Sequence, residues 1–542
     1  MISLPLTTLL LVILTLIGAQ ASVPASTATQ ALASVSVAVD TRPNIVLILA
    51  DDLDIQLGSL EVMPNLKALL AAQGASFDQA FVPISLCCPS RASLLRGQYP
   101  HNHGVYTNGP PTGGFQRFQE LNLEDQTLAT ALQGAGYRTA LLGKYLNGYP
   151  DPAAQSFIPP GWSEWYSPSS DNAYSEYNYS LNENGTLVAY GDAPADYLTD
   201  VLAAKANSFV TRTATTGEPF FIELATYAPH LPYTPAPRHV GLFAGVQAPR
   251  PPSFNEADVS DKPAAVQGKP LLNPVAISSI DTSYRLRLQS LQAVDELIAG
   301  LVQTLAASGE LDSTYIFFTS DNGYHMGAHR LSSGKYTPYE EDIRVPLLVR
   351  GPGVSAGVVR RELVSNIDLA PTFAEIAGLT PPAQVDGRSL VPLLQAGQSA
   401  PAWRQAVLFE QYPFAGQQPS SRRYPAGIGA ARIGYAGVLE PLDPQDVLAA
   451  APQAAYQGLR TATYKYVEYS TGERELYDLV ADPYELQNLA AGADPALLAA
   501  LKGWLNTYSS CAGAGCRSAD ALTPPILPGS LSRYIALPLL ER

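Results

Sequence analysis

Short apolar runs alternate with amphipathic stretches along the chain up to about residue 395. The apolar runs are apolar throughout, as expected for strands that helices cover on both faces of a sheet. This order predicts an α/β fold, in which helices flank a large, mostly parallel sheet. The predicted strands are Asn44–Ala50, Thr139–Leu142, Phe220–Ala225, Tyr315–Thr319 and Val345–Val349. The predicted helices are Pro64–Ala72, Thr127–Ala135, Tyr197–Val210, Tyr284–Ala307 and Leu369–Ala377.

The pattern changes in three places. Residues 148–190 are rich in Tyr, Trp, Asn and Ser, and residues 231–275 are rich in proline, so we expect both to be long loops. After about residue 400, Leu459–Glu468 and Arg474–Leu479 alternate like antiparallel strands around a Ser-Thr-Gly turn. We therefore expect a large domain over residues 43–400, a smaller α+β domain with an antiparallel sheet and a packing helix over 401–505, and a tail over 506–542.

The N-terminus has the pattern of an export signal. Residues 2–17 are an apolar run, and Ala19-Gln20-Ala21 supplies the small residues of a cleavage site. The run is short for a membrane span, so we expect a cleaved signal peptide over residues 1–21, with an uncleaved anchor as the alternative. Residues 22–42 are expected to be a flexible tether. The mature protein is then secreted or periplasmic, or lysosomal or extracellular in a eukaryote, with no stable membrane span.

Composition narrows the choice of ligands. Hydrophobic residues make up 46% of the chain and charged residues 15%, against about 25% charged in typical soluble domains. The formal net charge is −15, so the chain lacks the basic surface that binds nucleic acid or anionic membranes. An anionic substrate would have to be bound by a local metal ion and local cations.

Four cysteines fall into two groups. Cys511 and Cys516 enclose a short loop with two glycines, which in an exported protein predicts a local disulfide. Cys87 and Cys88 are adjacent and rarely form a disulfide with each other, so Cys88 is expected to be a buried structural residue. Pro89 is expected to begin a helix, which places Cys87 and Arg91 within one turn of each other at its N-terminus. A helix N-terminus beside an arginine is the electropositive, partly exposed environment in which a cysteine becomes reactive.

Two pairs of polar residues follow predicted strands. Asp51 and Asp52 come directly after the first strand, and Asp321 and Asn322 follow the strand that ends near Ser320. In open α/β sheets, ligands bind beyond the carboxyl ends of the strands. Either pair alone is typical of a helix cap or a turn. Together they indicate a site for a hard divalent cation such as Ca²⁺ or Mg²⁺.

The run Cys87-Cys88-Pro89-Ser90-Arg91 resembles the sulfatase signature Cys-x-Pro-Ser-Arg. The resemblance extends from about residue 43 to 490, and further motifs look most like the N-acetylglucosamine-6-sulfatase and heparan endosulfatase branch. These motifs are Tyr99-Pro100-His101-Asn102-His103, Gly143-Lys144-Tyr145-Leu146-Asn147 and Asp321-Asn322-Gly323-Tyr324-His325. The resemblance implies an alkaline-phosphatase-like fold. It also implies that a formylglycine-generating enzyme oxidises Cys87 to Cα-formylglycine (3-oxoalanine), whose hydrate attacks sulfur.

The resemblance assigns roles to further residues. It implies that the metal, Ca²⁺ with Mg²⁺ as the alternative, is bound by Asp51, Asp52, the modified Cys87, Asp321 and Asn322. Arg91 would hold the aldehyde hydrate, Lys144 and Lys335 would neutralise the sulfate oxygens, and His230 would protonate the leaving oxygen. Many sulfatases have a histidine where this chain has Leu146, so we take His325 as the base that expels sulfate, with Asn147 as a polar neighbour. Arg96 stands where the recognition sequence usually has threonine.

The remaining histidines and the aromatic residues of the first insertion have open roles. His101 and His103 either contact substrate or cap the signature helix. His325 and His329 are one helical turn apart, a spacing that suits a transition metal, but His325 is preferred as a pocket residue, and His239 is expected on the surface. The aromatic residues either stack on sugar rings or pack within a hairpin; they are Trp162, Trp165, Tyr166, Tyr174 and Tyr177.

The predicted function is that of a sulfatase (sulfuric ester hydrolase) that acts on a sulfated carbohydrate of the glycosaminoglycan type, such as a 6-sulfated glucosamine. The alternatives are an arylsulfatase, a phosphonate or phosphate ester hydrolase on the same scaffold, and a noncatalytic glycan-binding relative.

Overall fold

A computed structural model describes residues 41–169, 171–395, 402–413, 431–433, 439–441 and 454–527. The expected signal peptide, all but the last two residues of the tether and the end of the tail lie outside these ranges and remain predictions. None of the helices in the described ranges has both the length and the apolar composition that a membrane crossing requires.

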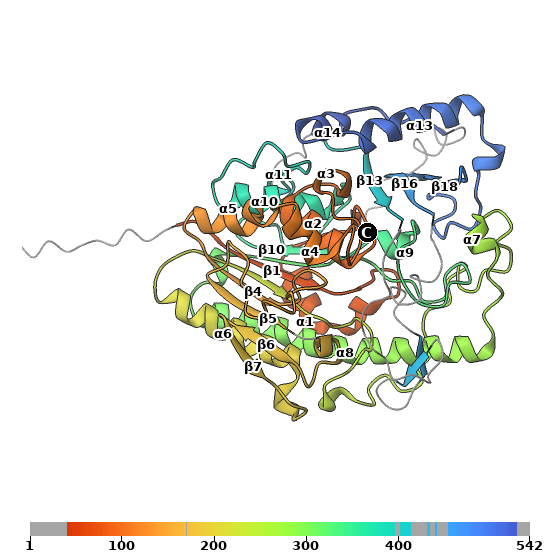
Figure 1. The fold of residues 1–542 in the computed structure, drawn as a ribbon. Helices are drawn as coiled ribbons and strands as arrows, with labels where there is room; N and C mark the ends of the chain where they lie inside the picture. The colour runs from red at the N-terminus through yellow and green to blue at the C-terminus, as the bar shows by residue number, and fades with distance from the viewer. Residues whose placement is uncertain are drawn as a thin grey trace, which may run out of the picture. The chain divides into compact units, whose positions relative to one another are not determined.

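A ten-stranded mixed sheet organises the described part of the chain, which confirms the predicted α/β fold (Figure 1). Strands β9, β1, β8, β4 and β5 lie next to one another in that order, and each pair is parallel. The full order is β11 (Val358–Arg360), β2 (Ala75–Phe77), β10 (Leu347–Arg350), β9 (Thr314–Ser320), β1 (Asn44–Ala50), β8 (Phe220–Ala225), β4 (Arg138–Gly143), β5 (Glu164–Pro168), β6 (Ser180–Glu183) and β7 (Thr186–Ala189).

All five predicted strands are present. The prediction for β1 and β8 matches at both ends, while β10 begins after Pro346, which has no N–H for a sheet hydrogen bond. The core has two layers, because successive residues of β1 point to opposite faces. Ile45 and Leu47 pack in one cluster with α5 and α10, and Val46 and Ile48 pack in the other with α6 and α8.

The predicted helices are also present, with different ends. Helix α8 (Pro274–Ala307) begins ten residues before the predicted Tyr284, because Asn273 caps it and Pro274 occupies its first turn. The segment predicted as Pro64–Ala72 is α1 (Pro64–Leu66) followed by a π-turn, Lys67–Ala71. The other helices are α2 (Cys87–Arg96), α3 (Pro100–His103), α4 (Gly114–Glu120), α5 (Leu128–Gly134), α6 (Leu198–Ala214), α7 (Ala264–Gln267), α9 (Glu340–Ile343), α10 (Leu369–Ile376), α11 (Val391–Leu394), α13 (Pro495–Ser509) and α14 (Ala514–Ala519).

The first insertion is not the long loop that was predicted. It contributes β5, β6 and β7, which extend the main sheet, and a short 3-10 turn, Asp171–Ser175. Trp165 is fully buried and its ring packs edge-on against Tyr145 and Tyr149. Trp162 is also buried against the core. These two tryptophans therefore pack the core and are not sugar-binding platforms.

The C-terminal region forms a separate antiparallel sheet in the order β13 (Ala406–Gln411), β16 (Tyr456–Thr461), β17 (Tyr464–Tyr469) and β18 (Arg474–Asp478). The single strand predicted over Leu459–Glu468 is wrong: the chain turns between β16 and β17, where the Thr461 hydroxyl accepts from the N–H of Tyr464. Short strand pairs are β3 (Ala80–Phe81) with β12 (Val364–Ser365), and β14 (Ala431–Ile433) with β15 (Leu439–Pro441). Cys511 and Cys516 are joined in a disulfide with a Cα–Cα distance of 4.8 Å.

Candidate active site

The site begins where two adjacent parallel strands end. Because β1 and β9 pair in register, Asp51 and Asp52 after β1 lie beside Asp321 and Asn322 after β9. The Asp52 N–H donates to the Asp321 carboxylate at 3.1 Å, and the Asn322 amide donates to the Asp52 carboxylate at 2.7 Å. All four side chains are at most 2% exposed. The strand ends thus gather three carboxylates and one amide in a buried space.

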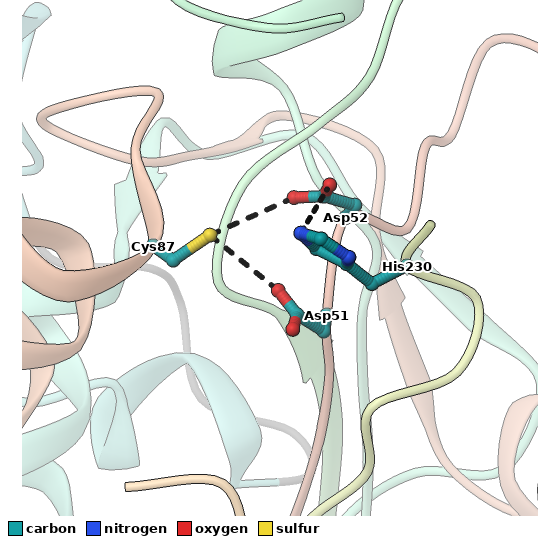
Figure 2. Close-up of side chains that lie close together, drawn as sticks. All are labelled: Asp51, Asp52, Cys87 and His230. Atoms are coloured by element: carbon teal, nitrogen blue, oxygen red, sulfur yellow. Dashed lines mark hydrogen bonds and ion pairs between the residues drawn. The ribbon is translucent and has the colours of Figure 1, made fainter. Parts of the chain in front are cut away.

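Cys87, the first residue of α2, points into this space (Figure 2). Its Sγ lies 3.5 Å from Asp51 Oδ1 and 3.9 Å from Asp52 Oδ1, and the Lys335 ammonium donates to it at 2.7 Å. The residue is fully buried, so the expectation of a partly exposed cysteine is wrong. Burial raises the pKa of the Cys87 thiol well above its usual value. As a thiol, this side chain is therefore neutral and a poor nucleophile.

Each carboxylate of the site is paired with a buried cation. The ammonium groups of Lys144 and Lys335 lie 2.6 Å from Asp51 and Asp52 respectively, and Arg91 Nε donates to Asp321 at 2.8 Å. Burial alone would lower the pKa of Lys144, but Asp51 and the other acidic groups around it together outweigh burial, and the pKa is raised. Burial alone would raise the pKa of Asp321, but Arg91, Lys144 and Lys335 together bring it below its usual value. Both groups are therefore charged at neutral pH.

The donor set fits a divalent cation. Ligand atoms of Asp51, Asp52, Cys87 and His230 all lie within 4.8 Å of one another. The buried Asn322 Oδ1 has no hydrogen-bond partner among the described residues. Buried carboxylate and amide oxygens are the ligands that Ca²⁺ and Mg²⁺ prefer. This cluster includes His230, which was predicted only as an acid, and omits Asp321, whose carboxylate is held by Arg91 and by the Asp52 N–H.

His230 faces the site from the loop after β8. Its Nδ1 lies 2.6 Å from the Leu231 carbonyl, which can only accept, so Nδ1 carries a hydrogen. Its Nε2 lies 3.6 Å from Asp52 Oδ2 (Figure 2). The Tyr174 ring, from the first insertion, is 4.7 Å from the His230 ring and 5.3 Å from the Lys144 ammonium. Tyr174 is therefore the predicted aromatic residue that contacts the site.

His325 lies beside the segment that carries Lys335, because the backbones of His325 and Gly334 exchange two hydrogen bonds of 2.8 and 3.0 Å. Its Nδ1 donates to both oxygens of Asp342 at 2.9 and 3.0 Å, which fixes the orientation of the ring. Leu146, which replaces the usual histidine, is buried in the apolar core.

Two histidines of the signature region support the structure. His103 Nε2 lies 2.9 Å from the Ser93 hydroxyl on α2, and its Nδ1 accepts from the Val105 N–H. Burial lowers the pKa of His103 to about 3, so the ring is neutral. His101 is held by Glu410 and by the Cys511 carbonyl. Each ring therefore has partners away from the carboxylates of the site.

The other two histidines are buried against carboxylates. His239 was expected on the surface, but it is 6% exposed and its Nε2 lies 2.9 Å from Glu296, so that expectation is wrong. His329 donates from Nδ1 to Glu256 at 2.6 Å, while the Nδ1 of His325 is held by Asp342. His325 and His329 therefore do not present two free Nδ1 atoms to a transition metal.

Sequence reasoning missed Arg287, on α8. Its fully buried guanidinium donates to the carbonyls of Asp52 and Pro229 at 2.7 and 3.1 Å, and to the Asp54 carboxylate at 3.1 Å. Asp52 has a φ of 64°, a left-handed conformation that surrounding bonds must hold. The signal was present in the sequence, since Arg287 shares the apolar stripe of α8 with Tyr284 and Leu291.

Comparison with known proteins points to one family. The sulfatase family model matches residues 43–379, and a model described as N-sulphoglucosamine sulphohydrolase, C-terminal, matches residues 327–432. The chain is 39% identical to N-acetylglucosamine-6-sulfatase of Homo sapiens over 497 residues, which cover 89% of this chain and 87% of that one. It is 34% identical to an arylsulfatase of Chlamydomonas reinhardtii over 522 residues, with coverage of 90% and 77%.

Two solved structures are similar to this chain over most of their length. BT4656, in complex with its substrate D-glucosamine-2-N,6-O-disulfate, aligns with a TM-score of 0.68 and 26% identity, covering 89% of this chain and 99% of that one. A phosphonate monoester hydrolase from Silicibacter pomeroyi aligns with a TM-score of 0.63 and 26% identity, with coverage of 85% and 93%.

Proposed function

Because the chain belongs to the sulfatase family of sulfuric ester hydrolases, we propose that it removes sulfate from a carbohydrate such as a 6-sulfated glucosamine. The observation that carries this proposal is the buried cluster in which Cys87, the strand-end carboxylates and His230 lie within reach of one another. Human N-acetylglucosamine-6-sulfatase and the glucosamine disulfate substrate of BT4656 support the substrate class.

The proposed active form contains formylglycine at position 87 and a divalent cation, Ca²⁺ with Mg²⁺ as the alternative, held by Asp51, Asp52, Asp321 and Asn322. The cation would act as a Lewis acid, and the hydrated aldehyde would supply a nucleophilic hydroxyl that the thiol lacks. The buried neutral thiol of Cys87 supports this proposal, since the unmodified side chain is poorly suited to attack sulfur.

The protein's own residues hold charges and protons around that position. Lys144 contacts Asp51 and Lys335 contacts Asp52, and in the proposed reaction their ammonium groups neutralise the non-bridging oxygens of the sulfate. Arg91, one turn after Cys87 on α2 and held by Asp321 and the Lys144 carbonyl, is the residue proposed to hold the aldehyde hydrate. His230 keeps its Nδ1 hydrogen on the Leu231 carbonyl, and in its doubly protonated form the ring donates the Nε2 proton to the departing sugar oxygen. His325, oriented by Asp342, is the proposed base for sulfate expulsion.

The same proposal covers maturation and location. Residues 1–21 direct export and are removed, residues 22–42 are a tether, and a formylglycine-generating enzyme converts Cys87. Residues 43–400 form the catalytic domain, residues 401–505 the subdomain with the antiparallel sheet, and residues 506–542 a tail with the disulfide loop.

Mass spectrometry combined with two cysteine variants tests this function. The peptide that spans Cys87 is expected to contain an aldehyde in place of CH₂–SH, and activity is normalised to that fraction. Cys87→Ala is expected to lose activity on N-acetylglucosamine 6-sulfate by more than ~10³-fold. The neighbouring Cys88→Ala is the matched control, because it makes the same chemical change in a buried residue that packs in the apolar core. It should retain activity within a few-fold.

Two results would contradict the proposal. One is full activity in protein whose Cys87 remains a thiol, and the other is glycan binding without turnover by fully converted protein. Sulfate and phosphate esters of one alcohol, assayed side by side, distinguish a sulfatase from the phosphonate or phosphate ester hydrolase that the Silicibacter pomeroyi structure represents.

A further inference from the structure

The backbone that carries Lys335 is held from the C-terminal sheet. The hydroxyl of Tyr456, the first residue of β16, donates to the Tyr336 carbonyl at 3.1 Å. The same hydroxyl lies 3.4 Å from the hydroxyl of Ser85, which in turn donates to the Thr337 carbonyl at 3.2 Å. Ser85 is two residues before Cys87. One buried tyrosine of the C-terminal sheet therefore joins the segment before Cys87 to the segment after Lys335.

Other residues of the same sheet hold the next part of the segment. Lys465 of β17 donates to the Pro338 carbonyl at 2.6 Å. Arg460 of β16 forms two hydrogen bonds with the Glu340 carboxylate, at 3.0 and 3.1 Å. The Tyr339 hydroxyl donates to a carboxylate of β18 at 3.0 Å, that of Glu475. These partners are buried.

The position of Lys335 depends on this backbone. Its ammonium lies 2.6 Å from Asp52 and 2.7 Å from Cys87 Sγ, and the residue after it, Tyr336, has a φ of 82°. A tyrosine adopts that conformation only where its surroundings hold it there. Because misplacement by about 1 Å lowers catalytic rates by as much as ~10²-fold, a change in the anchor should reach the site.

We propose that the C-terminal sheet positions Lys335 for catalysis, and that Tyr456 is the positioning residue that couples the two. This inference rests on the role proposed above for Lys335. Because the Tyr456 hydroxyl bonds to the carbonyl of Tyr336, the residue after Lys335, it acts on Lys335 through the backbone of residues 335–337.

The test is Tyr456→Phe, with Tyr464→Phe as its matched control. Tyr464, the first residue of β17, is as deeply buried, and its hydroxyl also donates to a carbonyl, that of Pro525, away from Lys335. Both variants lose one tyrosine hydroxyl bond from the same sheet, so their Tm values should fall by similar amounts. We expect kcat/KM per formylglycine-containing molecule to fall about tenfold in Tyr456→Phe, mainly through kcat, and less than twofold in Tyr464→Phe.

A double-mutant cycle separates positioning from a general loss of stability. In a Lys335→Ala background, Tyr456→Phe should change kcat/KM less than twofold, because the side chain that it positions is gone. The inference is overturned if Tyr456→Phe keeps wild-type activity, or if it lowers activity by the same factor with and without Lys335. If Lys335→Ala alone leaves activity unchanged, the proposed role of Lys335 fails, and with it this inference. If instead Lys335→Ala lowers activity and Tyr456→Phe does not, only this inference is overturned, and the proposed role of Lys335 stands.

Discussion

Replacing Arg287 tests how the loops of the candidate site are held together. Its buried guanidinium binds the Asp52 and Pro229 carbonyls and the Asp54 carboxylate. Arg287→Met keeps an apolar side chain of similar length and removes all three donations. The loop that carries Asp52 and the loop that carries His230 then lose the residue that joins them.

The expected loss of stability follows from the buried charge. Asp54 keeps hydrogen bonds from the Leu57 N–H and the Ser59 hydroxyl, but its charge loses its cation. Breaking a buried ion pair in this way costs about 3–5 kcal/mol. Since unfolding entropy is about 2.1 cal/mol/K per residue, the Tm of a chain of this size falls by about 3–5 °C. Activity is expected to fall about 10²-fold, because the left-handed backbone at Asp52 loses a donor at its carbonyl.

Calorimetry and kcat/KM, measured well below the Tm of each variant, check these values. A double variant, Arg287→Met with Asp54→Asn, removes the unpaired charge while leaving both carbonyls without the guanidinium. It should recover about half of the lost stability and none of the lost activity. The reasoning is refuted if Arg287→Met has wild-type kcat/KM, or if the double variant regains activity along with stability.

Three further outcomes are expected. Burial raises the pKa of Glu176 to about 8, so the folded protein keeps a proton that the unfolded chain releases above pH ~4.5, and stability falls as pH rises between these values. In denaturant titrations, Glu176→Gln should therefore be more stable than wild type by up to about 4 kcal/mol at pH 8.5 and equal to it near pH 4.5. A stability difference that stays constant across pH would contradict this. Chelation of the metal should abolish activity, and added Ca²⁺ should restore it. Asn322→Ala should weaken the Ca²⁺ affinity measured by calorimetry about tenfold, and an unchanged affinity would exclude the amide as a ligand. Replacing Cys511 and Cys516 together by serine should lower the free energy of unfolding by about 2 kcal/mol, as the length of the closed loop predicts, and should leave kcat/KM unchanged. A large loss of activity would show that the loop shapes the site.

Local sequence patterns predicted the centre of the fold and the strand-end residues of the site. β1, β8 and β9 are largely apolar, so their ends were visible in the sequence. Parallel pairing brings Asp51 next to Asp321 although the two residues are 270 positions apart. Tyr174 is one of five aromatic residues that the sequence singles out in the first insertion, and the other four lie elsewhere. Nothing in the local pattern distinguished it from Trp165, because the difference is which ring meets His230 after folding.

Local patterns cannot identify the partners of the positioning residues, even where the residue itself stands out, as Arg287 does on the apolar stripe of α8. Arg287 is 235 residues from Asp52, and Tyr456 is 120 residues from Tyr336, so each contact exists only once distant elements have packed. The burial of Cys87 was missed in the same way. A helix N-terminus in the sequence does not reveal which segments will cover it, and here Lys335 and the strand-end carboxylates do.

The balance of charge in the site explains how so acidic a chain handles an anionic ester. The net charge of −15 repels an anion at long range, but physiological salt screens that repulsion beyond about 8 Å. Inside the site, three carboxylates are matched by three buried cations, each at 2.8 Å or less. A bound dication therefore gives the site a local excess of about two positive charges in surroundings of low dielectric, where they act most strongly on a sulfate group. The attraction is confined to the pocket because the carboxylates proposed to bind the metal are also the ones that hold the lysines and the arginine.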